Sequence, residues 1–163
     1  LNSRRVDVTK IFNHVESNLL TGQGEIPEGH YTDETMKQTV VPGRNMIFLS
    51  ILGGIAWSTG ASVVALGIHA GDHTIYPDCR PSFYDAMNEA INEATDGNVH
   101  IIAPFLLNTK THIVSYAHQY HVPFNLTRTC YKNQKKACGK CGACVERLEA
   151  FKENGLTDPV RYE

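Results

Sequence analysis

Four cysteines lie within fifteen residues near the end of the chain, and they are Cys130, Cys138, Cys141 and Cys144. Four thiolates this close in sequence can surround one metal ion, and zinc takes four such ligands tetrahedrally at about 2.3 Å. The Cys-x-x-Cys spacing lets two sulfurs from one tight turn reach the same ion, and Gly139 and Gly142 supply backbone freedom there. The sequence therefore predicts one structural zinc ion per chain, closed to substrate.

Two other uses of these thiols fit the sequence less well. Disulfides suit a secreted protein, but no signal peptide is visible and the rest of the chain resembles a cytosolic one. An iron–sulfur cluster also accepts the Cys-x-x-Cys-x-x-Cys spacing, so a cluster or a redox role stays open beside zinc. The basic residues from Arg128 to Lys140 are interpreted as charge compensation for the thiolates.

Length, composition and charge limit the class of protein. The 163 residues are enough for one domain with a buried core, and 42% hydrophobic and 20% charged residues are typical of a globular protein. The net charge of -2 offers no polycation for nucleic acid. The longest apolar run, residues 46–57, is too short to cross a membrane. We expect a cytoplasmic protein without direct contact to nucleic acid or membrane.

The elements that would position reactive side chains alternate along the chain. A short strand is expected at residues 5–8, and the apolar runs 62–68 and 99–106 are typical of buried parallel strands. Residues 21–41 are rich in glycine, proline and polar side chains, which favours a long functional loop. Periodicity and capping residues predict helices at residues 9–20, 45–58, 81–96, 109–120 and 143–152.

This alternation predicts an α/β protein with a doubly wound, mostly parallel sheet, which binds ligands at the carboxyl ends of its strands. Residues 69–72 and 107–110 follow the two buried strands. We expect a nucleotide- and substrate-binding domain at residues 1–126 and a zinc-binding segment at residues 127–163. The sequence begins with Leu1 rather than Met, so we also expect an N-terminal portion of this domain to lie elsewhere.

Two helix starts carry features of anion sites. Residues 42–45 place a rigid turn and Arg44 and Asn45 at the beginning of a helix, where free N–H groups attract anions. An ordinary helix start with a solvated arginine explains this turn equally well. Lys110 begins the helix that follows the second buried strand, a position that suits a phosphate group.

Polar residues also gather around the run Tyr-Pro-Asp-Cys-Arg. The carboxylates of Asp72 and Asp78 are suited to accept hydrogen bonds from an amidine-like edge such as that of guanine, and Arg80 can hold a carboxylate or phosphate as a bidentate fork. Alternatively, Asp78 caps the following helix and pairs with Arg80. Cys79 stands apart from the other four cysteines and is expected to be a small buried residue.

Taken in order, these pieces resemble the 7-cyano-7-deazaguanine synthase family over nearly the whole chain. The resemblance rests on the Val-Pro-Gly-Arg-Asn turn, the run Tyr-Pro-Asp-Cys-Arg, residues 109–110 and 129–131, the four-cysteine run ending at Arg147, and the closing Asp158-Pro159. It implies an adenine-nucleotide α-hydrolase-like (PP-loop ATPase) fold, a homodimer, zinc on the four cysteines, and ATP with Mg²⁺ as co-substrate.

The resemblance also implies an activity. ATP would activate 7-carboxy-7-deazaguanine as an adenylate, ammonia would form the amide, and a second activation would dehydrate it to the nitrile used for queuosine-type nucleosides. Carried over by position, Asp72, Asp78 and Arg80 would bind the deazaguanine, while Arg44, Asn45 and Lys110 would face ATP or the activated acyl group. Arg44 and Lys110 are therefore the predicted catalytic residues.

One departure from the family pattern leaves other functions open. The family's pyrophosphate-binding Ser-Gly-Gly-x-Asp-Ser loop does not occur in these residues, and Gly53-Gly54 lacks the serine and aspartate. The alternatives are another PP-loop ligase acting on a different acid, and a zinc-stabilised, purine-binding module without catalysis.

Overall fold

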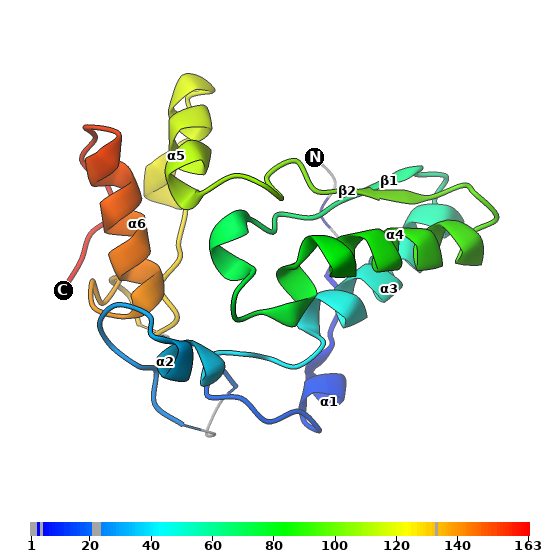
Figure 1. Ribbon diagram of the computed structural model, residues 1–163, viewed down its shortest axis with the longest axis horizontal. Helices are drawn as coiled ribbons and strands as arrows, with labels where there is room; N and C mark the ends of the chain where they lie inside the picture. The colour runs from blue at the N-terminus through cyan, green and yellow to red at the C-terminus, as the bar shows by residue number, and fades with distance from the viewer. Residues whose placement is uncertain (1–2, 4, 21–23, 133) are drawn as a thin grey trace.

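A computed structural model describes residues 3, 5–20, 24–132 and 134–163 of the chain (Figure 1). Two parallel strands, β1 (Val63–Ala65) and β2 (His100–Ile102), pair with Val64 opposite Ile101. These two central side chains are buried, whereas their neighbours Val63 and Ile102 are 43% and 42% exposed. The sheet formed by the described residues is therefore covered on one face only.

Two long helices cover that face. α3 (Arg44–Ser58) packs on β1, α4 (Pro81–Ala94) packs on β2, and the helices also contact each other. Gly53 permits this approach, since a Cβ there would lie 3.3 Å from the Ile91 side chain. Both helices were predicted, and Pro81 takes the first position of α4, where no N–H partner is needed. The core consists of Leu49, Ala56, Val64, Ile91, Val99 and Ile101.

The strands are shorter than the predicted runs 62–68 and 99–106, because only three residues of each form ladder hydrogen bonds. Beyond Ala65 and Ile102 the chain turns into irregular segments, which include the 3₁₀ helices η1 (Ala70–Asp72) and η2 (Pro77–Cys79). The structure thus shows an α/β protein with a small parallel sheet.

A second group of helices lies at the opposite side of the view in Figure 1. α5 (Lys110–Gln119) packs alongside α6 (Gly142–Glu153) through Val114, Ala150 and Phe151. Thr109 caps α5 as predicted, since its hydroxyl accepts a hydrogen bond from the His112 backbone N–H. The 3₁₀ helix η3 (Phe124–Leu126) connects α5 to the cysteine segment.

The predictions for the N-terminal part were mostly wrong. α1 (Thr9–Phe12) ends eight residues early, because none of its residues is buried and its packing includes little more than the Phe12 ring against the Phe48 ring. Residues 5–8 form no strand. The expected loop contains α2 (Asp33–Lys37), capped by reciprocal hydrogen bonds between Thr32 and Thr35. None of the helices placed in the structure is long and apolar enough to span a membrane.

Candidate functional site

The four predicted cysteines converge in the structure. The sulfurs of Cys130, Cys138, Cys141 and Cys144 all lie within 4.8 Å of one another, and each residue is buried. The Sγ atoms of Cys141 and Cys144 are 3.5 Å apart, and those of Cys138 and Cys144 are 3.9 Å apart. A tetrahedron with metal–sulfur bonds of about 2.3 Å has edges of about 3.8 Å. The four-thiol centre therefore fits a single ion, and all five cysteines of the chain are free thiols.

Backbone N–H groups next to the four-thiol centre stabilise the thiolate form of one of its cysteines. The N–H groups of Lys140 and Cys141 point at the Cys138 sulfur from 3.4 and 3.2 Å. Although burial opposes it, these hydrogen bonds lower the pKa of the Cys138 thiol to about 7. Gly139 makes the turn with a φ of +69°, a conformation that side chains disfavour. Gly142 has a different role, since a Cβ there would lie 2.4 Å from the Tyr31 ring.

A buried ion pair between Arg147 and Asp158 holds the last residues of the chain against α6. Arg147 donates to both carboxylate oxygens of Asp158 at 2.6 and 2.9 Å, and the two side chains are 6% and 1% exposed. The same guanidinium reaches the Thr127 hydroxyl, and the Tyr162 hydroxyl bonds Asp158. This bidentate arrangement joins residues on either side of the cysteines into one unit.

A cavity of about 380 Å³ with charged side chains in its lining lies near the four-thiol centre, since sequence neighbours of Cys130 and Cys144 line it. It lies where the chain leaves β1 and where α5 and α6 begin, as expected for ligands at the carboxyl ends of parallel strands. The predicted residues Asp72 and Lys110 both line it. The remaining lining residues are Tyr31, Gly67, His69, Tyr76, Arg128, Thr129, Tyr131, Ala143 and Glu146.

His69 and Asp72 form a titratable pair in this cavity. The Nδ1 atom of His69 accepts the Gly71 backbone N–H at 3.2 Å, so its Nε2 carries the proton and faces the Asp72 carboxylate at 3.4 Å. Burial lowers the pKa of His69 and raises the pKa of Asp72. The charges of Lys110 and Arg44 oppose the rise for Asp72, which brings three predicted site residues into one electrostatic neighbourhood.

Lys110 has a partner that sequence reasoning missed. Its ammonium group forms an ion pair with the Glu146 carboxylate of α6. Glu146 follows the last cysteine by two residues, and His69 immediately follows the predicted strand 62–68. Position at a strand end was the signal available for His69, but nothing in the sequence connected Glu146 with Lys110, because the pairing spans 36 residues.

The other predicted residues are engaged within the protein. The carboxylate of Asp78 accepts the Asn45 backbone N–H at 2.8 Å, so it caps α3 rather than the following helix α4. Arg80 donates to the carbonyls of His73 and Thr74 and forms no ion pair with Asp78 in the structure as described. The N-terminus of α3 therefore does hold an anion, which is the protein's own carboxylate.

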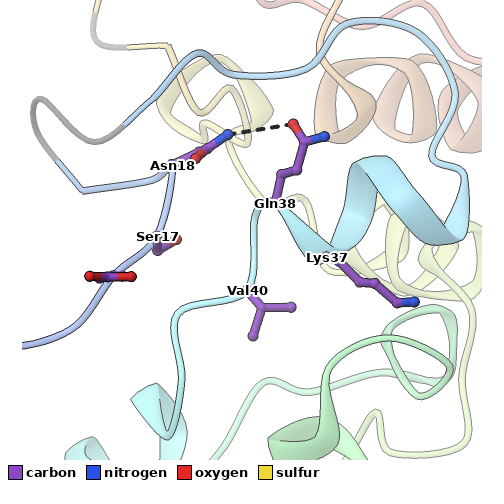
Figure 2. Close-up of a pocket in the computed structure, with 6 residues that line it drawn as sticks. Ser17, Asn18, Lys37, Gln38 and Val40 are labelled. Carbon is purple, nitrogen blue, oxygen red and sulfur yellow. Dashed lines mark hydrogen bonds between the residues drawn. The ribbon is translucent and has the colours of Figure 1, made fainter.

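The cavity beside the cysteines is distinct from larger hollows between loops. One of about 550 Å³ is lined by residues 16–18 and by residues at the end of α2 and just after it, where the side chains of Asn18 and Gln38 meet through a hydrogen bond (Figure 2). Cys79 is buried as predicted, and burial raises its pKa to about 12, so it is a poor nucleophile.

The fold and the site define an α/β protein with four converging thiols placed to hold one metal ion and a cavity lined by charged side chains near them. Residues 1–155 match the family described as "Queuosine biosynthesis protein QueC", and the chain belongs to this family. It is 50% identical to the 7-cyano-7-deazaguanine synthase of Marinomonas sp., over 97% of this chain and 72% of that protein. It is 47% identical to that of Rhizobium rhizogenes, over 97% of this chain and 68% of that protein.

Proposed function

We propose that this chain belongs to an ATP-dependent ligase that converts 7-carboxy-7-deazaguanine and ammonia into 7-cyano-7-deazaguanine in queuosine biosynthesis. The supporting observation is the cavity that brings Asp72 and Lys110 together beside four converging thiols. Family membership supports this reaction, and the charged residues that line the cavity support the cavity as its site. The named relatives are synthases of this nitrile.

The proposed chemistry assigns a task to each polar group. The substrate carboxylate attacks the α-phosphorus of ATP and pyrophosphate leaves; ammonia then displaces AMP to give the amide, and a second adenylation followed by loss of AMP gives the nitrile. Lys110 and Arg44 would neutralise charge on the acyl-adenylate. Asp72 would accept hydrogen bonds from the amidine edge of the base. Asp78 and Arg80 at the purine and Asn45 at the nucleotide would have to exchange the hydrogen bonds that they make within the protein for bonds to these ligands. Mg²⁺ would accompany ATP.

For the metal we propose zinc in a structural role. Four thiols within 4.8 Å suit one tetrahedral ion, whereas an iron–sulfur cluster holds its thiolates farther apart. A site saturated by four thiolates leaves no open position for substrate. Zinc would therefore act by fixing the first turn of α6, which also lines the cavity through Ala143.

The wider architecture is proposed in the same way. The parallel pairing of β1 and β2 and the exposed apolar side chains Val63 and Ile102 are consistent with a larger doubly wound sheet of the PP-loop type. We propose that residues 1–126 form the nucleotide- and substrate-binding domain and residues 127–163 the zinc-binding segment. We also propose that the protein is a homodimer and that it works in the cytoplasm, where free thiols persist.

The test is nitrile formation. The protein is incubated with 7-carboxy-7-deazaguanine, ammonium, ATP and Mg²⁺, both as the given chain and as a fusion carrying a Ser-Gly-Gly-x-Asp-Ser segment ahead of residue 1. We expect AMP and the nitrile from the fusion, and from Lys110→Met a residual rate about a hundredfold lower that is still measurable. Purine binding and zinc binding without AMP release in either form would instead support a non-catalytic module.

A further inference from the structure

The Lys110–Glu146 pair links the predicted catalytic lysine to the cysteine segment. Lys110 is the first residue of α5, and Glu146 lies in α6, two residues after Cys144. The two side chains are 23% and 29% exposed, so the pair is mostly shielded from water. An ion pair in such surroundings is screened less than one on the open surface. The ion pair with Glu146 can therefore determine the position of the Lys110 ammonium group.

The cavity contains a second carboxylate, Asp72, that could also pair with the Lys110 ammonium group. The charge of Lys110 lowers the pKa of Asp72, and the charge of Glu146 raises it, so all three groups interact. His69 and Arg44 also act on Asp72. Without Glu146, Asp72 would be the remaining acid of this cavity able to attract the ammonium group. The lysine would then neutralise the proposed purine-binding carboxylate instead of facing the acyl group.

The position of Glu146 is in turn fixed by the thiols. Cys141 is the N-cap of α6 and Cys144 lies in its first turn, so a metal on the four-thiol centre would hold the start of this helix. The Thr129 hydroxyl donates to the Ala143 carbonyl at 3.2 Å, and the Tyr31 ring lies against Gly142. A bound metal would therefore affect the cavity by holding the first turn of α6, which carries Ala143 and is followed by Glu146.

We infer that Glu146 is a positioning residue for Lys110, placed by the four-thiol centre. The inference rests on the proposed function and adds a role for the metal within it. Glu146 touches no reacting atom in this scheme. It holds the ammonium group between α5 and α6 and so keeps it from pairing with Asp72.

The inference is tested with Glu146→Gln in the active fusion. Removing a negative charge beside the binding site should lower KM for the anionic substrate about threefold. Misplacing the lysine should lower kcat about tenfold. The matched control is Glu149→Gln, because Glu149 lies on the same helix and pairs with His30 at the surface. We expect the control to match the wild type in kcat, KM, zinc content and melting temperature.

A double variant separates positioning from folding. If Glu146 acts through Lys110, Glu146→Gln should lower kcat no further in a Lys110→Met background. An additional tenfold loss in that background would overturn the inference. Equal kinetics for Glu146→Gln and Glu149→Gln would also overturn it. Should Glu146→Gln lose zinc or melt early, Glu146→Asp keeps the charge, and recovery of kcat by this variant supports positioning while its failure refutes it.

A chemical readout works without turnover. Acetylation of Lys110, followed by mass spectrometry of the 163-residue protein, should become about threefold faster in Glu146→Gln and after zinc removal. Lys37 on α2 serves as the internal reference, and Glu149→Gln should leave both rates unchanged. Unchanged Lys110 labelling in both conditions would refute the inference even if the protein makes nitrile. Faster labelling without any nitrile would uphold the pairing and refute the proposed reaction instead.

Discussion

Replacing Cys141 with serine removes one sulfur from the four-thiol centre and should destabilise the end of the chain severely. Cys141 is fully buried and occupies the N-cap position of α6. The buried side chains of the cluster around the centre are the four cysteines and two alanines, with Ile26, Val160 and Tyr162 packed at its edge, so the cluster is small for a core. In such a segment the free energy of metal binding is largely the free energy of folding.

The size of the effect follows from binding linkage. If three thiolates and a serine bind zinc about a thousandfold more weakly, the metal contributes about 4 kcal/mol less to the free energy of unfolding. For a chain of this size, 1 kcal/mol corresponds to about 2–4 °C in melting temperature. We therefore expect Cys141→Ser to melt about 8–16 °C below the wild type at equal zinc concentration, and excess zinc to restore part of the difference.

The assay combines metal content with thermal unfolding. The wild type should carry one zinc per chain, and Cys141→Ser should carry much less after dialysis. Cys79→Ser is the matched control, because Cys79 is equally buried but lies outside the centre and accepts a hydrogen bond from the Asn45 side chain at 3.4 Å. This control should keep its zinc and lose about 1 kcal/mol. Equal melting temperatures for the two variants would show that the thiols fold the segment without metal.

Three further outcomes are expected. Asp158→Ala leaves the buried Arg147 guanidinium without its carboxylate, and urea unfolding should show a loss of about 3–5 kcal/mol; a loss under 1 kcal/mol would mean that water reaches this pair. Gly142→Ala would drive a methyl group into the Tyr31 ring, so its melting temperature should fall with the zinc content retained at saturating zinc; an unchanged melting temperature would contradict that close approach. Burial lowers the pKa of His69, so the unfolded chain binds a proton more readily, and the free energy of unfolding should decline as pH falls below about 6.5. His69→Gln should flatten that part of the pH profile, and an unaltered profile would show that this histidine does not contribute.

The sequence predicted correctly those helix starts that are set by residues within one turn, and it failed where a helix depends on packing against distant residues. The helices at Pro81 and Thr109 begin where they were predicted, since proline and a capping threonine act within one turn. The helix predicted for residues 9–20 stops at Phe12, because an amphipathic pattern forms a helix only where a core accepts its apolar face. The loop predicted for residues 21–41 likewise concealed α2, whose reciprocal threonine cap was not recognised.

The sequence by itself indicated which four thiols converge, because Cys-x-x-Cys turns bring successive sulfurs together and a short loop can return Cys130 to them. It also determined that a lysine begins α5 and that polar residues follow the strands. Only the tertiary structure decided which charges meet. It turned Asp78 toward the start of α3, sent Arg80 to two carbonyls, and set Glu146 against Lys110. Such choices depend on how helices distant in sequence pack together, since an ion pair follows distance in space and not spacing along the chain.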